Sequence, residues 1–363
     1  MFVSARTLKP LLTVAANITP VRFGKSYSCI LFRPNERGQQ ELVATDLETT
    51  LIVQLDTTGE PIEMAVSGKF LAALVGMYED TLEITTGAGK IPELFVNPLD
   101  VKQTNTLRGV DPADFPSINQ ELAADMQMFA ELSGREMVTY IDRLKATAGK
   151  NEMEYVVFTG DIVQSYNKYS FTYRDVQLAP KVLRIPLGAF LHLRALVQST
   201  EERIQVLSNT QYVQFRGPSF SLTVELGSGT FLDASQFKTG EDSLVIVRAA
   251  DMQRVLKVVN GSTGVLTFSV GEGDTDVLAI FYSQDGEELF RFTFAHQTPT
   301  DVVKPFTLTV TAPVLRPIID GLGKEIVGFG TRVTPTKVLV GLVVSGEYGQ
   351  VFAPANPAWM KAA

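Results

Sequence analysis

Hydrophobic and polar residues alternate along most of this chain. Stretches such as RIQVLSNTQYVQFRG, VLTFSV and LFRFTFAH are rich in Val, Thr, Phe and Ile, and short Gly, Asn and Ser segments separate many of the apolar runs. A period of two with β-branched and aromatic residues is typical of strands that are buried on one face. Most of the chain is therefore predicted to form β-sheet.

Six segments have the spacing of helices instead. They are residues 5–18, 68–80, 133–150, 187–199, 249–260 and 312–324. Pro10 is expected in the first turn of its helix, where a missing N–H costs little. Pro317 is expected to shorten or kink the sixth helix.

These helices and strands recur in a fixed order. Helix, strands, helix, strands appears three times at intervals of roughly 115–130 residues, which indicates a threefold internal repeat. Polar segments near 120–128 and 238–243 have the composition of linkers between compact domains. We expect an α+β fold of three β-rich domains at residues 1–122, 123–241 and 242–363, each with two helices.

The charge of the chain is unevenly distributed. The formal net charge of −8 argues against a simple basic nucleic-acid binder. The six helical segments, however, hold 12 basic and 6 acidic residues, so they carry +6 and the remainder carries −14. Two interpretations stay open: solvated faces of amphipathic helices, or a basic surface that contacts phosphates without reading sequence.

Candidate catalytic and metal-binding motifs are weak. FGKS at 23–26 lacks the first glycine of a phosphate-binding loop and follows a helix rather than a strand. The two histidines, His192 and His296, do not suggest a zinc site or a triad. GEGDTD at 271–276 lacks the length of a calcium loop and predicts a hairpin turn. We expect no catalytic residue, no metal and no cofactor.

Residues 43–51, VATDLETTL, place two carboxylates in an otherwise apolar stretch. Alternation along one strand places Ala44, Asp46 and Glu48 on one face and Val43, Thr45, Leu47 and Thr49 on the other. With no histidine or metal partner nearby, Asp46 is expected to accept hydrogen bonds from turn or backbone donors, and Glu48 to be solvated.

The compartment is predicted from what the sequence lacks. No apolar run reaches the roughly 18 residues of a membrane helix, and the N-terminal segment lacks the pattern of a signal peptide. The single cysteine, Cys29, excludes an internal disulfide. We expect a cytoplasmic protein that does not bind a membrane.

Four segments resemble, in order and spacing, the first domain of the bacterial DNA polymerase III β subunit family, the sliding clamps. LKPLLTV at 8–14 resembles the start of that domain's first helix, and ATDLE at 44–48 its strand signature. AVSGKFLAAL at 65–74 resembles the lead-in and second helix, and DPADFPSI at 111–118 the closing segment. RIPLGAFLHLRAL at 184–196 extends the resemblance into the second repeat, whereas the third repeat matches mainly by pattern.

The resemblance implies a DNA clamp fold and a function. Two chains would join head to tail as a homodimer ring around double-stranded DNA, with helices lining the hole. Such a ring is a processivity factor without catalysis: it holds DNA without sequence preference and tethers the replicative DNA polymerase, and a clamp loader is a further partner. The alternative is a β-rich enzyme or binding module whose repeats are coincidental.

Site residues follow from the resemblance and from helix charge. Candidates for DNA contact are Arg22, Lys25, Lys69, Arg143, Lys150, Asn151, Tyr155, Arg194, Arg254 and Lys257. The resemblance implies a partner-peptide pocket of Val157, Leu232, Phe237, Val351, Ala353 and Pro354. It implies a dimer interface containing Leu107, Val258 and Val259, although these apolar residues could equally be core.

Two departures from the family bear on the partner-peptide pocket. Segment 165–175, SYNKYSFTYRD, lacks the family's Gly-His-Arg, and the chain continues past the family's usual end. A partner motif different from the family's is therefore expected. Such divergence fits a phage or mobile-element clamp, or one from a distant bacterial lineage.

Overall fold

The computed structural model describes residues 1–19, 28–87, 92–99, 103–116, 125–149, 154–167, 171–197, 199, 201–231, 240–259, 262–311, 314, 326–333, 340–346 and 349–354. The chain divides into two compact units, Met1–Val138 with Gly188–Leu226 and Thr139–Leu187 with Gly227–Ala363.

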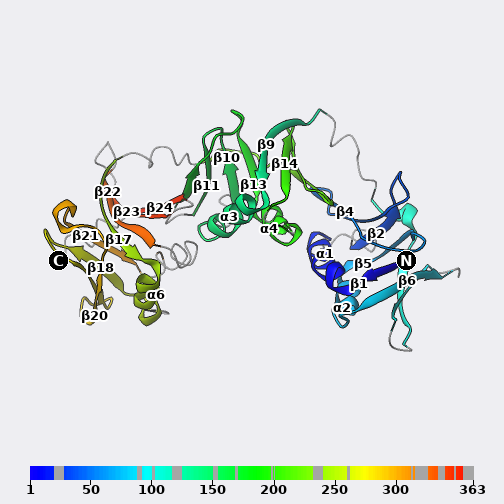
Figure 1. The fold of residues 1–363 in the computed structure, drawn as a ribbon, viewed down its shortest axis with the longest axis horizontal. Helices are drawn as coiled ribbons and strands as arrows, with labels where there is room; N and C mark the ends of the chain where they lie inside the picture. Colours follow the sequence, from blue (N-terminus) through cyan, green and yellow to red (C-terminus); the bar gives the residue numbers. More distant parts are fainter. Residues whose placement is uncertain are drawn as a thin grey trace. The chain divides into compact units, whose positions relative to one another are not determined.

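The same order of strands occurs three times, each time with a helix after the first strand, and in the first two repeats a second helix follows the fifth strand (Figure 1). The first repeat holds β1 (Phe2–Ser4), α1 (Ala5–Ile18), β2 (Cys29–Pro34), β3 (Gln40–Thr45), β4 (Thr49–Gln54), β5 (Met64–Ser67), α2 (Gly68–Val75), β6 (Thr81–Gly87), β7 (Glu93–Pro98) and β8 (Asn105–Val110). The second holds β9 (Gln127–Ser133), α3 (Gly134–Leu144), β10 (Tyr155–Phe158), β11 (Ile162–Tyr166), β12 (Phe171–Asp175), β13 (Leu183–Pro186), α4 (Leu187–Leu196), β14 (Arg203–Ser208), β15 (Tyr212–Arg216) and β16 (Phe220–Glu225).

The third repeat holds β17 (Glu241–Arg248), α6 (Ala249–Val258), β18 (Val265–Val270), β19 (Asp276–Tyr282), β20 (Glu288–Ala295), β21 (Phe306–Thr311), β22 (Ile326–Val333), β23 (Val340–Gly346) and β24 (Gly349–Pro354). Its predicted second helix, 312–324, lies almost wholly outside the described residues. The threefold order is thus observed, while the three domain boundaries stay a prediction.

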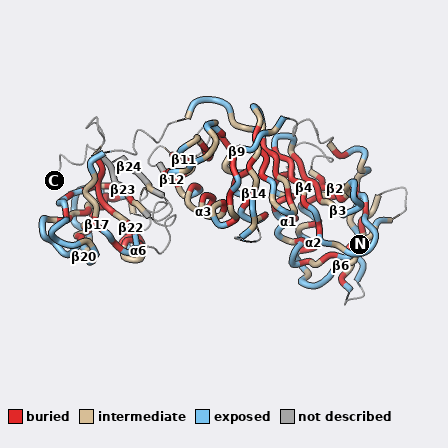
Figure 2. The backbone as a smooth tube through the Cα atoms, turned by 45° about the horizontal axis from the view of Figure 1, so that its top comes forward, coloured by how far each residue is buried: buried red, intermediate tan, exposed pale blue. Residues whose placement is uncertain are grey.

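The first unit is built on one antiparallel sheet of twelve strands, in the order β1-β6-β7-β8-β5-β2-β3-β4-β16-β15-β14-β9. Helices α1 and α2 lie side by side against it (Figure 1). Helix α1 buries Leu8, Leu11 and Leu12 at helical spacing, which is why this segment is a helix rather than a strand. Figure 2 shows buried residues concentrated along β2, β3 and β4.

The second unit contains two antiparallel sheets. Eight strands follow the order β13-β10-β11-β12-β24-β23-β22-β17, and four follow the order β20-β19-β18-β21. A core cluster joins strands of both sheets to α6, with Phe268 and Phe329 in edge-to-face contact at a centroid distance of 4.8 Å. GEGDTD forms the predicted turn between β18 and β19, where the Asp274 carboxylate accepts a hydrogen bond from the Gly271 N–H.

Four predicted helices end earlier than expected. Helix α2 ends at Val75 rather than 80, since Gly76 follows, and α3, α4 and α6 end at Leu144, Leu196 and Val258. The expectation for Pro10 is wrong: it is the sixth residue of α1, in the second turn, so it removes one interior hydrogen bond. The helix is retained because its apolar face is fully buried, which outweighs a local propensity cost.

The prediction of one strand through VATDLETTL is also wrong. Strand β3 ends at Thr45 and β4 begins at Thr49, and residues 46–48 form the turn between them. The Asp46 carboxylate accepts hydrogen bonds from the Glu48 N–H at 3.0 Å and the Thr49 N–H at 2.6 Å. Leu47 has a φ of 81° and is 53% exposed. The expected roles of Asp46 as an acceptor of backbone donors and of Glu48 as a solvated residue are confirmed.

Candidate nucleic-acid interface and strand junctions

The packing of α6 decides which of its side chains reach solvent. Ala249, Met252 and Val255 are buried at helical spacing, so positions 254 and 257 fall on the opposite face. Arg254 and Lys257 are exposed there. Arg254 pairs with Asp251 one turn earlier at 3.0 Å, whereas Lys257 has no ion-pair partner within the described part of the chain.

The other helices also present exposed cations. Lys69 on α2 is exposed and, among the residues described, has no ion-pair partner; Arg194 on α4 is exposed and Arg143 on α3 is half-buried. On α1, the Lys9 ammonium lies 2.5 Å from a carboxylate oxygen of Glu79, just beyond α2. The hydrogen bond from Lys9 lowers the pKa of Glu79. Positive charge thus gathers on helices, as the composition indicated, but part of it is already neutralised.

Tyr155 has a structural environment besides its candidate role in DNA contact. The guanidinium carbon of Arg184 lies 4.0 Å from the centroid of its ring, a cation–π arrangement. The ring also packs against Gly227, where an added Cβ would come within 2.2 Å of it. Of the remaining DNA candidates, Arg22, Lys25, Lys150 and Asn151 lie outside the described residues.

The three interface candidates have different surroundings. Val258 is 63% exposed at the end of α6, whereas Val259 is 2% exposed and belongs to the core. Leu107 on β8 is half-buried and lines a hollow of about 710 Å³ beside Phe70, which is 66% exposed. Cys29 lines the same hollow, and burial raises the pKa of its thiol. Leu107 and Val258 are therefore available to a partner, and Val259 is not.

The pocket candidates are also divided. Val157 is completely buried in β10, between β11 and β13. Val351, Ala353 and Pro354 lie on β24, where their backbones pair with Val344, Leu342 and Gly341 of β23. Leu232 and Phe237 lie outside the described residues. Three of the four described pocket candidates therefore lie on strand β24.

Two strand pairings join successive repeats, and local periodicity does not predict them. In the first junction, β4 pairs with β16 over five residue pairs, including Leu51 with Leu222, both completely buried. Backbone hydrogen bonds extend it at both ends: the Gln54 N–H donates to Ser219 and the Glu225 N–H to Glu48, each at 2.8 Å. In the second junction, β12 pairs with β24 over three described pairs, centred on Thr172 with Val351.

A hydrogen-bonded cluster of Arg332, Asp242, Tyr173 and Gln350, here called the Arg332 cluster, lies at the second junction, and its Arg332 and Tyr173 are buried. Arg332 is 4% exposed and donates two hydrogen bonds to the Asp242 carboxylate, at 2.6 and 2.7 Å. Its Nη1 also donates to the Tyr173 hydroxyl at 2.8 Å, and that hydroxyl donates to Gln350 at 2.6 Å. The cluster joins β17, β22, β12 and β24, so it connects the second repeat with the third.

The charges within the Arg332 cluster are stable at neutral pH. Hydrogen bonding to Asp242 raises the pKa of Arg332. Burial raises the pKa of Tyr173, more than the neighbouring guanidinium lowers it. The cluster is therefore a charged arginine with a neutral phenol, which is a structural arrangement rather than an acid–base pair.

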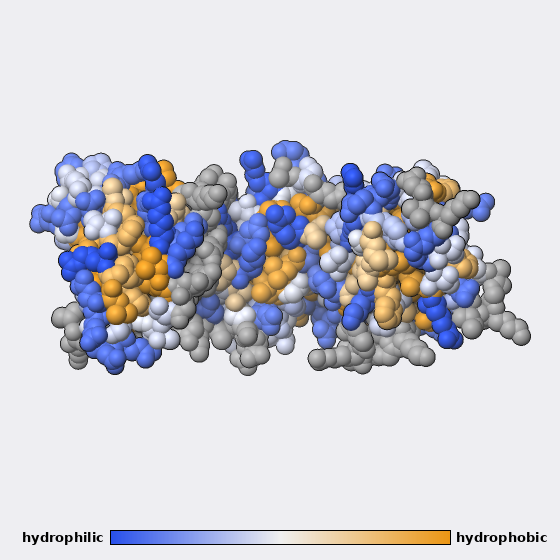
Figure 3. All heavy atoms as spheres, turned by 90° about the horizontal axis from the view of Figure 1, so that it is seen from below, coloured by the Kyte–Doolittle hydropathy of each residue, from blue (hydrophilic) through white to orange (hydrophobic). Residues whose placement is uncertain are grey.

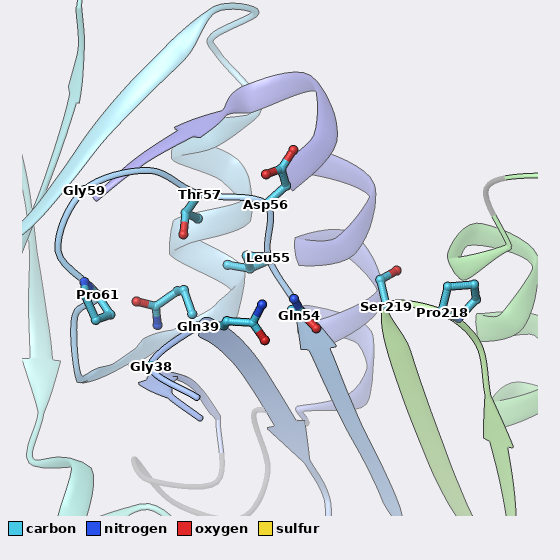
Figure 4. Close-up of a pocket in the computed structure, with 11 residues that line it drawn as sticks. Gly38, Gln39, Gln54, Leu55, Asp56, Thr57, Gly59, Pro61, Pro218 and Ser219 are labelled. Atoms are coloured by element: carbon cyan, nitrogen blue, oxygen red, sulfur yellow. The ribbon is translucent and has the colours of Figure 1, made fainter. Parts of the chain in front are cut away.

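A polar hollow of about 470 Å³ in the first unit offers no catalytic set (Figure 4). Gln39, Gln54 and Asp56 line it from the β3–β4 region, and Pro218 and Ser219 from the β15–β16 turn. Within the described ranges, no group of three His, Cys, Asp or Glu residues could hold a metal.

The two histidines lie apart from any nucleophile or carboxylate pair. Burial lowers the pKa of His192 on α4. The Nε2 of His296 lies 2.9 Å from the carbonyl oxygen of Asp274, so this ring is engaged by a turn. In the part of the chain that the structure describes, neither histidine belongs to a constellation for acid–base chemistry.

The face in Figure 3 shows hydrophobic areas interrupted by hydrophilic side chains. Within the described residues, no helix is both long enough and apolar enough to cross a bilayer.

Comparisons with known proteins identify the fold. No family model and no curated protein matches the sequence. The DNA polymerase III β subunit of Thermotoga maritima is 14% identical and has a TM-score of 0.78, over 98% of both chains. The β subunit of Pseudomonas aeruginosa is 14% identical with a TM-score of 0.77, over 98% of this chain and 99% of the other. The sliding clamp of Bacillus subtilis is 11% identical with a TM-score of 0.78, over 98% of both chains. Along nearly its whole length, this chain has the α+β fold of the DNA polymerase III β sliding clamps.

Proposed function

We propose that this protein is a DNA sliding clamp: a non-catalytic ring that encircles duplex DNA and tethers a replicative DNA polymerase. The observation that carries the proposal is the structural likeness to solved clamps across 98% of the chain. A chance resemblance in sequence pattern would not reproduce the clamp fold over all three repeats.

DNA contact is assigned to the exposed cations of the helices. Lys69, Arg254 and Lys257 are exposed on α2 and α6 of an otherwise acidic protein. Phosphate contacts by such residues carry no sequence information and weaken with salt. Weak contacts of this kind allow a clamp to slide.

Strand topology supports assembly of two chains head to tail. β4, β12 and β20 occupy the same place in the three repeats, as do β8, β16 and β24. β4 pairs with β16 and β12 pairs with β24. Of these two sets of strands, β20 and β8 have no such pairing with each other among the described residues. Among the described strands, β20 pairs only with β19, and residues 105–108 of β8 pair with β7 on one side only. β20 of one copy paired with β8 of another would form a junction of the same kind. Two such junctions, one at each contact between the two copies, would close a ring.

Exposed apolar residues fit the same assembly. Phe70 and Leu107 lie near β8, and Val258 and Leu289 lie on α6 and β20. Burying them against a second copy would remove apolar surface from water at roughly 25 cal/mol per Å². A Leu107→Arg variant is expected to be monomeric by light scattering, whereas Val302→Arg, at a residue that is 59% exposed elsewhere, should remain a dimer.

Partner binding is assigned to the region of β24, which the resemblance makes one wall of the peptide pocket. A clamp of Pseudomonas aeruginosa has been solved bound to griselimycin. We propose griselimycin as a first probe of this chain. Protection of segment 349–354 from hydrogen exchange by griselimycin would support the assignment, and protection confined to other strands would contradict it.

The decisive experiment uses topology. The protein is mixed with linear duplex DNA that has cohesive ends, the ends are ligated, and the circles are passed through a gel-filtration column at high salt. A clamp stays with ligated circles and is released after a single restriction cut. Equal release from circular and linear DNA, together with a monomer by light scattering, would overturn the proposal.

A matched pair of variants tests the helices. Arg254→Glu with Lys257→Glu should weaken duplex binding at low salt and reduce the salt slope by about 1 for each phosphate that is no longer neutralised. Arg203→Glu, on the exposed face of strand β14, should leave duplex binding unchanged. Equal weakening of duplex binding in both proteins would exclude a specific role for α6.

A further inference from the structure

Among the described residues, the second junction has fewer strand pairs than the first, and a cluster of polar side chains connects its strands. Five pairs and two additional backbone hydrogen bonds hold β4 to β16. Only three described pairs hold β12 to β24, whereas β24 pairs with β23 over six. Within the described residues, strand β24 therefore has twice as many pairs with β23 of the third repeat as with β12 of the second.

The Arg332 cluster connects the strands on both sides of that pairing. The guanidinium lies on β22 and its carboxylate partner, Asp242, lies directly across from it on β17, both within the third repeat. The same guanidinium donates hydrogen bonds to Tyr173 on β12 of the second repeat and to Gln350 on β24. Tyr173 and Gln350 are also directly opposed in the strand register.

We propose that Arg332 is a positioning residue that holds β24 in register with β12 and so fixes the wall of the partner-binding region. The connection to partner binding rests on the proposed function, but the positioning itself does not. Gln350 immediately precedes Val351, the first pocket candidate on β24. A shift of Gln350 would therefore be transmitted to Val351 through the backbone.

The burial of the Arg332 cluster explains why it can act this way. A bidentate guanidinium–carboxylate pair has a fixed geometry, unlike a flexible lysine. At 4% exposure the arginine is shielded from solvent, so its hydrogen bonds are directional constraints rather than transient surface contacts. The two hydrogen bonds to Asp242 fix the orientation of the guanidinium plane. The Nη1 hydrogens then donate to Tyr173 and Gln350 and so constrain where these two side chains lie.

Hydrogen exchange of the full-length protein tests the proposal, with the first junction as an internal control. In Arg332→Met, the segments that contain 171–173 and 350–352 should exchange at least about tenfold faster, while segments 49–53 and 220–224 keep their wild-type rates. Tyr173→Phe removes one hydroxyl from a packed site and keeps the proposal testable if Arg332→Met does not fold. It should accelerate the same segments by a smaller factor.

Two comparisons separate positioning from general stability. Arg332→Lys keeps the charge but removes the bidentate fork, so it should not restore slow exchange. Arg203→Met, which removes an exposed arginine from the corresponding strand β14, should change neither junction. Wild-type exchange of 171–173 and 350–352 in both Arg332→Met and Tyr173→Phe would overturn the proposal, and so would equal acceleration at both junctions.

None of these measurements uses DNA or a partner. If β24 is released as expected but the protein fails the ligated-circle experiment, the positioning role stands and the clamp function is wrong.

Discussion

The first and second junctions solve the same topological problem with different chemistry. In the first, β4 and β16 bring together Leu51 and Leu222, and five pairs run without interruption. In the second, Tyr173 lies opposite Gln350, and a buried arginine completes the contact. An apolar pairing tolerates small displacements because the hydrophobic effect has no preferred direction. A hydrogen-bonded cluster does not, because its donors and acceptors must stay aligned.

This difference suggests a division of roles. The first junction needs only to hold two repeats together, whereas the second lies beside the strand assigned to partner binding. A defined register is more valuable there than additional stability. Buried ion pairs are known to contribute more to structural specificity than to free energy in some proteins, and the second junction is a candidate for that behaviour.

The largest effect on the free energy of unfolding is expected from a substitution in the first junction, and it tests whether apolar pairing holds that junction. Leu222 is completely buried opposite Leu51, so Leu222→Ala should lower the free energy of unfolding by about 2–5 kcal/mol. Urea unfolding measures this change. A decrease well below 1 kcal/mol would show that apolar pairing does not hold this junction.

A smaller effect is expected from the polar contacts of the first junction. The hydroxyls of Thr45 and Thr50 lie 2.9 Å apart and are buried. Thr50→Val should cost about 1 kcal/mol, since Thr45 still accepts the Leu47 N–H. Hydrogen exchange at β4 and β16 should stay slow. Release of these strands by Thr50→Val would mean that the first junction also depends on polar register, and the contrast with the second would fail.

The smallest effect concerns pH and the turn that leads into β4. Burial raises the pKa of Asp46 above its usual value, and hydrogen bonds from the Thr49 and Glu48 N–H groups oppose the shift only in part. The folded protein therefore binds the Asp46 proton more tightly than the unfolded chain does. As the pH rises from about 4 through the folded pKa of Asp46, loss of this proton lowers the free energy of unfolding.

The measurement for Asp46 is a difference between two proteins. Thermal unfolding of the wild type and of Asp46→Asn is followed across this pH range, where other carboxylates titrate equally in both. The midpoint of the wild type relative to the variant should fall as the pH rises. The opposite slope would mean that the backbone hydrogen bonds dominate over burial.

Much of the fold could be predicted from periodicity. The helices α1, α2, α4 and α6 begin at the predicted residues because each start coincides with a change from alternating to helical spacing. Their ends were less predictable: α2 ends at Val75, because Gly76 follows and glycine has a low helix propensity, whereas the apolar spacing extended the prediction to residue 80. The single strand predicted for VATDLETTL is wrong because the turn rests on side-chain hydrogen bonds of Asp46, which alternation does not detect.

The candidate sites were predictable only in part. Helix charge correctly indicated exposed cations on α2 and α6, since a residue opposite a buried stripe must face solvent. It did not reveal that Glu79 neutralises part of α1, because that contact joins residues 70 positions apart. For the adjacent residues Val258 and Val259, both equally apolar, packing at the end of α6 decides which one is buried.

By itself, the sequence determined the threefold order of helices and strands, because the periodicity that predicts each element depends only on residues close together in the sequence. Only the tertiary structure decided how the repeats are joined. Arg332 and Asp242 are 90 positions apart, and Arg332 and Tyr173 are 159 apart. Their meeting depends on strand register and on which strands become neighbours, and these are set by the burial of whole sheet faces rather than by any local pattern.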